Sequence, residues 1–333
     1  MGVSMQEAID ENDNALDYRE YKFESILNGT FTNRYIEEGG RYTTLYETSK
    51  RLRWNPSIDI GWEEHRDEEY IHSDIVKIFE EFEFFQELNK KEKRRFVRDY
   101  QSWQISQFLH GEQGALIISS QLVSCTPDLD SKLFCSSQTI DEAHHVEAFM
   151  KYMELRKIPL WRVNNSLKGL LQKTLNEEKW DLKFIGMHII IESVALASFA
   201  TIRSQTDDPL LKKLLEYILK DESRHVNYGV EFLKNHLSNM REDELEERAI
   251  FAFKSCVLMK ERLIPYDVFN QWKLDRNIAV KTYVNSHVVS EYKHNLFSKI
   301  IPLLNKIGLI TKAQHKNYVM IGAEKYIDIQ LEF

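Results

Sequence analysis

The sequence has few cysteines and no extended basic segment, and both features limit what the protein can do. Its three cysteines, Cys125, Cys135 and Cys256, are an odd number without metal-site spacing, so a structural zinc site is not expected. The formal net charge is −8, which argues against a nucleic-acid partner. The one basic cluster, residues 90–95, begins a predicted helix. We interpret it as a solvated helix face; the alternative is a docking patch for an acidic electron carrier.

The sequence also lacks the usual signals for export or membrane attachment. Its first 20 residues are polar and acidic, unlike a signal peptide, and Met1-Gly2 does not begin a complete myristoylation pattern. No apolar stretch reaches the roughly 18 residues that a membrane span needs. We therefore expect a cytoplasmic protein in a reducing compartment, with no membrane partner.

Strand patterns are nearly absent, so we expect an all-α fold in a single domain spanning residues 1–333. Residues 1–72 are the least regular and are expected to form an extended N-terminal arm, with the metal-binding core at 90–237 and C-terminal helices at 238–333. Helical spacing of apolar residues begins at Ser73. It predicts further helices over about 90–124, 129–157, 161–176, 178–204, 209–237, 242–263, 276–306 and 312–326.

Two copies of one motif organise the predicted core. Each copy reads Asp-Glu-x-x-His, which places a carboxylate and an imidazole one helical turn apart on the same face. A lone Glu in an apolar run precedes the motif Glu by 30 positions in both copies, and the copies are offset by 80 positions. The first copy comprises Glu112, Asp141, Glu142 and His145, and the second comprises Glu192, Asp221, Glu222 and His225.

The predicted turns lie where antiparallel helices would need them to bring these side chains level. The midpoint between the two Glu residues of the first copy is Pro127, which Asp128 follows. The midpoint in the second copy is Asp207, with Pro209 close behind. Proline with Asp and Thr is typical of turns and helix starts. Four helices would then bring four carboxylates and two imidazoles together, as in the dinuclear centre of a ferritin-like four-helix bundle with additional flanking helices.

Glu192 is the most informative single residue, because it lies among Ile189, Ile190, Ile191 and Val194. A lone buried carboxylate costs several kcal/mol unless something compensates its charge. Taken alone, an exposed or protonated Glu would be the simpler interpretation. The repeated pattern favours a two-metal site instead, and carboxylates with imidazoles suit iron or manganese.

Two aspartates fit a supporting role beside that site. Each precedes its motif Glu and points sideways toward the neighbouring helix. We expect Asp141 to accept a hydrogen bond from His225, and Asp221 to accept one from His145, which would fix the histidine tautomers. The alternative is that both are ordinary surface aspartates.

These residues resemble the ferritin-like diiron oxygenase superfamily, which includes bacterial multicomponent monooxygenases, ribonucleotide reductase small subunits, acyl carrier protein desaturases and N-oxygenases. The resemblance covers about residues 100–230; residues 221–225 are close to the monooxygenase form, whereas residues 141–145 depart from it at His144. It implies the metal ligands Glu112, Glu142, His145, Glu192, Glu222 and His225.

The resemblance also implies an activity and its partners. Two iron ions, or a manganese and an iron ion, would activate O2 to hydroxylate, N-oxygenate or desaturate a small organic substrate. No flavin or iron–sulfur motif is visible in the sequence, so a reductase or ferredoxin is expected to supply electrons. A homodimer is expected from the family. The alternatives are a radical-generating or Mn/Fe oxidase of the ribonucleotide reductase small-subunit type, and a non-catalytic iron-binding protein.

Three positions depart from the patterns of these relatives. Phe149 stands where a radical tyrosine would follow the first His ligand, and Tyr152 is a weaker substitute. Leu196 stands where monooxygenases often have Thr. His188, one turn before Glu192, is a candidate seventh ligand, with a packed or supporting His as the alternative. By helical position, we expect a substrate pocket, or otherwise plain core, at Phe108, Ala115, Phe149, Leu196 and Phe199.

Overall fold

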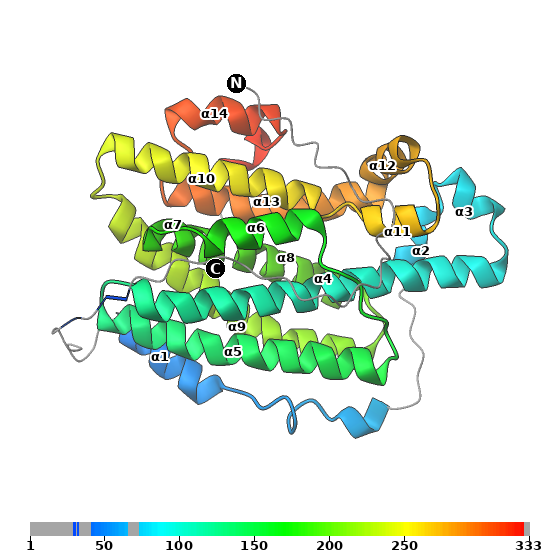
Figure 1. The fold of residues 1–333 in the computed structure, drawn as a ribbon, viewed down its shortest axis with the longest axis horizontal. Helices are drawn as coiled ribbons and strands as arrows, with labels where there is room; N and C mark the ends of the chain where they lie inside the picture. Colours follow the sequence, from blue (N-terminus) through cyan, green and yellow to red (C-terminus); the bar gives the residue numbers. More distant parts are fainter. Residues whose placement is uncertain (1–28, 31, 33–40, 66–72, 330–333) are drawn as a thin grey trace.

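The computed structural model describes residues 29–30, 32, 41–65 and 73–329, and these residues form helices and connections with no β-strand among them. The all-α prediction is confirmed. Four long helical segments form the centre of the fold (Figure 1). They are α4 (Lys90–Cys125), α5 (Leu129–Leu155), the continuous series α7 (Trp180–Phe184), η2 (Ile185–Ile191) and α8 (Glu192–Gln205), and α9 (Pro209–Leu237). Their bounds lie within a few residues of the predicted ones.

Local sequence signals explain where these helices begin. Asn89 caps α4 through a capping box with Glu92, which satisfies backbone donors that the first helical turn leaves free. The Asp128 side chain accepts a hydrogen bond from the Ser131 backbone and caps α5. Asp208 caps α9 in the same way, immediately before Pro209. Both hairpin turns therefore lie at the predicted midpoints, and they bring α4 beside α5 and α8 beside α9.

The third core segment departs from a regular α-helix. Residues Ile185–Ile191 form a π-helix, in which the Glu192 N–H donates to the Met187 carbonyl five residues earlier. The sequence predicts one helix over about 178–204, because apolar side chains fill this stretch and their spacing does not reveal the wider turn. The π segment lies directly before Glu192, the residue that brings this helix into the predicted site.

The flanking helices surround this core. α6 (Asn165–Leu175) packs against α4 and α10, and α13 packs against α8. The bounds of the elements outside the four core segments and α6 are α1 (Arg41–Leu52), η1 (Trp62–His65), α2 (Ser73–Phe79), α3 (Glu83–Glu87), α10 (Glu242–Glu261), α11 (Tyr266–Gln271), α12 (Arg276–Asn285), α13 (His287–Lys306), α14 (Lys312–Met320) and η3 (Glu324–Tyr326). The single-domain organisation stays a prediction.

Two predicted helices outside the core were wrong in extent, and one core helix ends slightly earlier than predicted. The helix expected over 276–306 is broken at Ser286, whose hydroxyl caps the new helix α13. The helix expected over 312–326 stops at Met320, before Gly322 with a φ of 75°. The helix expected over 129–157 ends at Leu155, and Lys157 has a φ of 52°. The left-handed conformation of Lys157 ends this helix two residues before Pro159.

The N-terminal arm is not extended throughout. Residues Arg41–Leu52 form helix α1, which packs against α5 and α9, and the chain then runs along the core to η1 (Figure 1). Trp54, in this part of the arm, is only 5% exposed, so its indole is part of the interior. Most of residues 1–40 lie outside the described residues, and the predicted arm is not described there.

One helical stretch, Trp180–Gln205, is long and apolar enough by composition to cross a membrane. The expectation that no stretch reaches this length was therefore wrong. In the 18-residue window of this stretch that is apolar enough to span a membrane, 83% of the residues are buried inside the structure, as expected for the central helix of a packed core. Its apolar character serves helix packing in this fold.

Candidate metal centre

The six predicted ligand residues converge at one level of the four-helix core. Each of the four helical segments contributes at least one carboxylate, and all six side chains are buried, with exposed fractions of 0–4%. They come from α4 (Glu112), α5 (Glu142 and His145), α8 (Glu192) and α9 (Glu222 and His225). The helical hairpins therefore bring together residues that lie up to 113 positions apart in the sequence.

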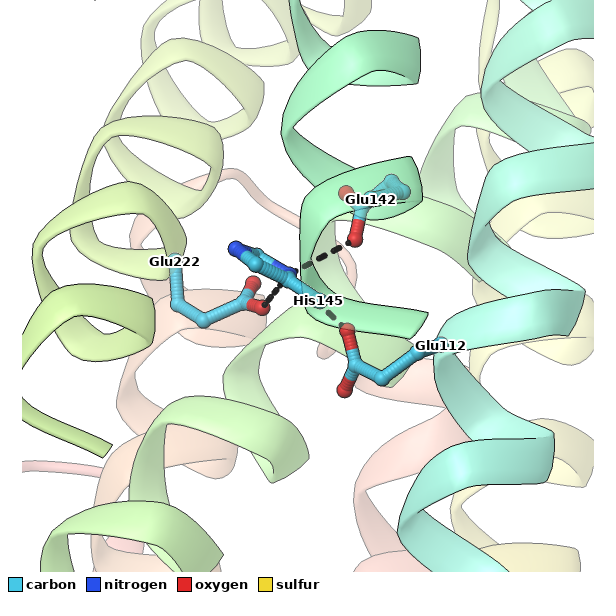
Figure 2. A group of neighbouring side chains, drawn as sticks. All are labelled: Glu112, Glu142, His145 and Glu222. Carbon is cyan, nitrogen blue, oxygen red and sulfur yellow. Dashed lines mark hydrogen bonds and ion pairs between the residues drawn. The ribbon is translucent and has the colours of Figure 1, made fainter. Parts of the chain in front are cut away.

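The first half of the cluster is centred on His145 (Figure 2). Its Nδ1 lies 3.0 Å from Glu112 Oε2, 3.2 Å from Glu142 Oε2 and 3.3 Å from Glu222 Oε1. These four side chains have ligand-type atoms within 4.8 Å of one another. A single Nδ1–H cannot donate to three carboxylates at once, so the convergence fits donor atoms arranged around a cation.

The second half is centred on His225. Its Nδ1 lies 3.3 Å from Glu142 Oε1, 3.4 Å from Glu222 Oε2 and 3.7 Å from Glu192 Oε1. Glu142 and Glu222 thus direct one oxygen toward each histidine. Two carboxylates shared between two imidazole-centred groups are an arrangement suited to two neighbouring metal ions, with Glu112 and Glu192 at the outer ends.

The cluster carries a strong electrostatic cost when no cation compensates it. Burial, together with the charge of the nearby Glu192 carboxylate, raises the pKa of Glu142 to about 8. Burial and the same carboxylate raise the pKa of Glu222 well above its ordinary value. Burial opposes protonation of His225, but the surrounding carboxylates hold its pKa well above its usual range. Divalent cations would replace these protons, so the donor set fits two metal ions.

The outward-facing nitrogen of each histidine meets an aspartate from the opposite motif. His145 Nε2 lies 3.2 Å from Asp221 Oδ2, and His225 Nε2 lies 3.4 Å from Asp141 Oδ2. The expected crossed contacts are therefore present. With Nε2–H donating outward, Nδ1 is left free to bind a metal. The tautomer-fixing role of Asp141 and Asp221 remains a prediction.

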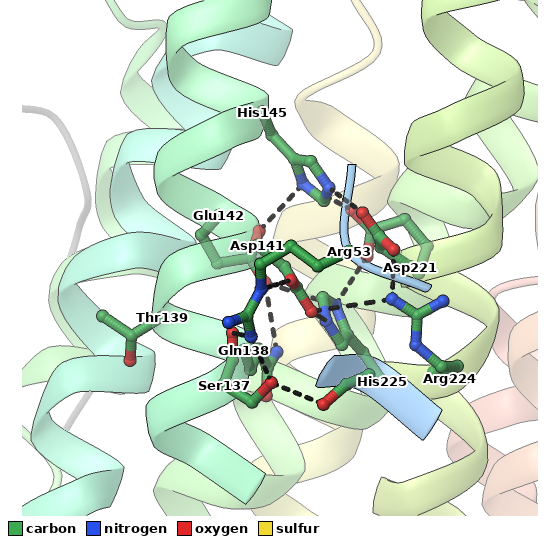
Figure 3. Close-up of polar contacts among 12 residues, drawn as sticks. Arg53, Ser137, Gln138, Thr139, Asp141, Glu142, His145, Asp221, Arg224 and His225 are labelled. Atoms are coloured by element: carbon green, nitrogen blue, oxygen red, sulfur yellow. Dashed lines mark hydrogen bonds and ion pairs between the residues drawn. The ribbon is translucent and has the colours of Figure 1, made fainter. Parts of the chain in front are cut away.

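Two arginines, Arg53 and Arg224, lie beside these aspartates (Figure 3), and an indole contacts one of them; none of the three was expected from the sequence. Arg224 pairs with Asp221 and lies 3.7 Å from Asp141. Arg53 Nε lies 3.5 Å from Asp141 Oδ1, and Trp54 Nε1 donates to Asp221 Oδ2 at 2.7 Å. Arg224 could have been recognised inside the second motif, three residues after Asp221. The arm residues carry no periodic signal that would place them here.

Gln138 is a further residue that the sequence analysis missed. It lies one helical turn before Glu142 on α5, so helical spacing alone could have identified it. Its amide contacts Glu142 and Glu192 and also His188. The structure does not place His188, the candidate seventh ligand, in either metal-ligand group. Instead, the imidazole faces Gln138 and stacks on Phe184, with ring centroids 3.9 Å apart.

The predicted pocket residues separate into two places. Phe108, Phe149 and Phe199 pack against one another, with the Phe108 and Phe199 ring centroids 5.0 Å apart. Ala115 and Leu196 pack with a different part of the core. One cavity touches both α4 and α8 and includes none of these five residues. Its lining comprises Ile78, Tyr100, Gln104, Ile202, Gln205, Thr206, Tyr283, Val288, Val289 and Tyr292. Pocket assignment to the five remains a prediction.

Comparison with known proteins agrees with this geometry. A model of the p-aminobenzoate N-oxygenase AurF family matches residues 39–308. An R2-like ligand-binding oxidase with an aerobically reconstituted Mn/Fe cofactor is 18% identical, with a TM-score of 0.54, covering 82% of this chain and 95% of its own. A point mutant of an R2-like ligand-binding oxidase, anaerobically reconstituted with Mn/Fe, gives 17% identity and a TM-score of 0.57, over 82% and 95% of the chains.

At these identities the solved structures establish the fold, which is ferritin-like as predicted. The match to the family covers most of the chain, including every residue of the buried carboxylate and histidine cluster. The protein therefore belongs to the p-aminobenzoate N-oxygenase AurF family of oxygen-dependent oxidoreductases.

Proposed function

We propose that the protein is a two-metal oxygenase that uses O2 to oxidise the nitrogen of a small aromatic amine. The observation that carries the proposal is the pair of groups centred on His145 and His225, which share Glu142 and Glu222. Two redox-active ions bound there, either two iron ions or one manganese and one iron ion, would supply the electrons and the Lewis acidity that O2 activation requires. The family description supports an arylamine as the substrate class.

The protein's own residues hold and orient the donor atoms. The four carboxylates offer a total charge that suits two divalent ions, and the histidines direct Nδ1 inward while Asp141 and Asp221 accept hydrogen bonds from Nε2. Burial of the cluster excludes bulk water, which strengthens each electrostatic contact. Because the donor atoms are already held in place and water is excluded, few protein groups or water molecules need to move when the substrate reacts.

The packed rings of Phe108, Phe149 and Phe199 support an apolar or aromatic substrate. Phe108 lies one turn before Glu112 on α4, and Phe199 lies two turns after Glu192 on α8. The cavity lined by Gln104 and Ile202 begins one turn beyond these two rings and has a volume of about 40 Å³, room for about one water molecule. Gln104 is eight residues before Glu112, or roughly 12 Å along the helix. We infer that a flat, apolar amine approaches the metals from this side, and that the side chains around the cavity, with Phe108 and Phe199, move apart to admit it.

Several aspects of the proposal rest on the sequence alone. The sequence has no flavin or iron–sulfur motif, so we expect a reductase or ferredoxin to reduce the metals. A cytoplasmic homodimer also remains our expectation. Monooxygenation, rather than another oxidation, is the form of chemistry that the family description favours.

A radical-generating oxidase is the second candidate, because the similar solved structures are R2-like oxidases. The residue one turn after His145 is Phe149, which cannot form a tyrosyl radical. Tyr152, two turns after His145, donates to Asp208 Oδ2 at 2.9 Å, and Arg156 binds the same carboxylate. Burial, followed by the Asp208 charge, raises the pKa of Tyr152 well above its ordinary value. Tyr152 therefore has a structural role in this fold, and we favour the oxygenase.

The proposal is tested by mixing anaerobic, Fe(II)-loaded protein with 18O-labelled O2 in the presence of a panel of para-substituted anilines. We expect an absorbance transient within the protein, followed by an arylamine product that carries 18O on nitrogen by mass spectrometry. Glu222→Ala protein with equal added iron is the control, since free iron would oxidise amines without this residue. Iron oxidation with no labelled product from any amine would contradict the assigned substrate class.

A further inference from the structure

The amide of Gln138 links two of the proposed metal ligands from different helices. Its Nε2 donates to Glu192 Oε1 at 2.7 Å and to Glu142 Oε1 at 3.2 Å. Both of these oxygens are the ones that face His225 Nδ1. Gln138 is 1% exposed, so water cannot replace these hydrogen bonds easily. The two amide contacts therefore fall on the half of the cluster centred on His225 (Figure 3).

His188 fixes which way this amide points. The His188 Nε2 lies 2.8 Å from Gln138 Oε1. We assign the imidazole proton to Nε2, because an amide oxygen can only accept a hydrogen bond. Burial lowers the pKa of His188 to about 3, so the imidazole is neutral and has a single N–H to donate. Turning the amide over would place its oxygen against two carboxylates and its NH2 group against an N–H donor. The orientation with NH2 toward Glu142 and Glu192 is therefore the only one in which all partners are complementary.

The surroundings hold His188 in this position. Phe184 stacks on the imidazole, and Gly229 on α9 lies directly against it. A Cβ on residue 229 would lie 2.3 Å from the His188 Cβ, so any other residue there would force the imidazole to move. His188 also lies within the π-helix η2, whose wider turn removes it from the position directly below Glu192. Three elements thus converge on the histidine that aligns Gln138.

We propose that Gln138, aligned by His188, is the positioning residue that holds Glu192 and Glu142 in place for the metal ion bound at His225. This inference rests on the proposed two-metal function. Without the amide, the two carboxylates would repel each other and turn away from the arrangement seen here, and the ion at His225 would bind less tightly. The half centred on His145, which includes Glu112, would be affected much less.

The test is an anaerobic titration of the metal-free protein with Fe(II), read by calorimetry. The wild type is expected to bind two equivalents. Gln138→Met, which keeps the side-chain length but removes both donors, should weaken one equivalent by about 10–100-fold, the usual effect of losing a residue that supports a ligand. The other equivalent should keep its affinity within about threefold. Because no turnover is involved, the measurement does not depend on finding the substrate.

Gln107→Met is the matched control. Gln107 is also a buried glutamine, but its amide bonds to the backbone of Arg162 and Asn164 rather than to a ligand. Each variant loses buried hydrogen bonds, so the melting temperature should fall in both. Gln107→Met should nevertheless bind both iron equivalents with unchanged affinity, because Gln107 contacts no proposed ligand. Electron paramagnetic resonance of bound Mn(II) gives a second readout, since only a moved carboxylate should change the zero-field splitting of one bound ion.

Two variants outside the ligand set test the role of His188. His188→Leu removes the donor to Gln138, and Gly229→Ala displaces the imidazole from the opposite helix. Both should weaken the same single equivalent as Gln138→Met, by a smaller factor, because the amide remains. Combining His188→Leu with Gln138→Met should add little to Gln138→Met alone, since both changes act through one contact. Gly229→Ala provides the test if Gln138→Met does not fold.

The outcomes separate this inference from the proposed function. If wild-type protein binds no Fe(II) or Mn(II), the two-metal function itself is wrong. If wild type binds two equivalents and Gln138→Met binds both with unchanged affinity, the positioning role is overturned and the function stands. Equal weakening of both equivalents in Gln138→Met, or the same pattern in Gln107→Met, would also overturn the inference, because it would show a general loss of structure.

Discussion

Trp54 and Asp221 form a direct hydrogen bond that joins the N-terminal arm to the histidine end of the metal cluster. The indole Nε1 lies 2.7 Å from Asp221 Oδ2, and the same oxygen lies 3.2 Å from His145 Nε2. The Trp54 ring also stacks on Tyr217, with centroids 5.1 Å apart. The arm is thereby connected to a residue that contacts a proposed ligand.

The first prediction concerns this contact. Trp54→Phe removes the indole donor but keeps an aromatic ring, and it should lower the free energy of unfolding by about 1.5–3 kcal/mol, as expected for a hydrogen bond to a charged group. Urea denaturation of the metal-free protein measures the change. Trp62→Phe, which removes an indole hydrogen bond to the Pro56 carbonyl on the same arm, is the control and should cost less. If both variants lose the same free energy of unfolding, the hydrogen bond to Asp221 contributes no more than the one to the Pro56 carbonyl.

The second prediction concerns Glu192, which supplies a carboxylate to only one half of the cluster. Glu192→Ala should reduce bound iron from two equivalents to about one per chain, because Glu112, Glu142, Glu222 and His145 remain to bind the first. Elemental analysis after anaerobic loading and desalting gives the count. Glu216→Ala, at an exposed position on α9, should retain both equivalents. An unchanged iron content in Glu192→Ala would show that the ligand assignment is wrong.

The third prediction distinguishes structural from radical roles for Tyr152. Tyr152→Phe should lower stability by about 1–3 kcal/mol, because the Asp208 carboxylate loses one buried hydrogen bond. The yield of oxidised amine per O2 should stay the same. Electron paramagnetic resonance after reaction with O2 should show no tyrosyl signal in either protein. A stable signal in wild type that disappears in Tyr152→Phe would favour the radical-generating oxidase.

The fourth prediction concerns the pH dependence of a buried ion pair. Asp181 Oδ2 on α7 lies 2.8 Å from Arg248 Nη2 on α10 and 3.2 Å from His236 Nε2 on α9. Burial alone would raise the pKa of Asp181, but these partners lower it below its ordinary value of 3.8. The carboxylate therefore stabilises the fold fully above about pH 4, and this contribution is lost as the pH falls through the lowered value.

Arg248→Met should remove this behaviour. The variant leaves Asp181 buried and without its arginine, which should cost about 3–5 kcal/mol at pH 7. The stability deficit of the variant should shrink as the pH falls from 7, because protonation relieves its unpaired carboxylate. It should shrink further below about pH 4, where protonation also breaks the ion pair in the wild type. Urea denaturation at pH 7, 5 and 3.5 measures it. Arg241→Met, at an exposed ion pair with Asp243, should show no such trend. A constant deficit across the range would contradict the assignment.

Much of the core could be predicted because the necessary information is local. Capping side chains such as Asn89 and Asp208 act within one turn, and the spacing of Glu112 and Glu142 is set by helix rise and hairpin position. The convergence of the six candidate ligands follows from these two features. The break at Ser286 was missed because an apolar pattern on both sides hid a residue whose hydroxyl starts a new helix.

Contacts between distant segments could not be predicted in this way. Trp54 and Arg53 reach the cluster from an arm with no helical or strand period, so nothing in the sequence specifies which surface they cover. The sequence predicts that His188 and Glu192 point the same way, because residues four apart lie on the same face of an α-helix. The π-helix changes that relation, and the imidazole meets Gln138 instead. Apolar composition is compatible with both helix types, so the difference was invisible.

The π-helix at Ile185–Ile191 has a consequence for how the chain can vary in length. A π turn contains one more residue than the turns on either side, so losing a residue there can be absorbed by closing the turn into an α-helix while α7 and α8 keep their directions. Losing a residue within Glu192–Gln205 would instead rotate the rest of α8 by about 100°. The fold is therefore expected to tolerate a one-residue deletion at 185–191 and not one in the helix that follows.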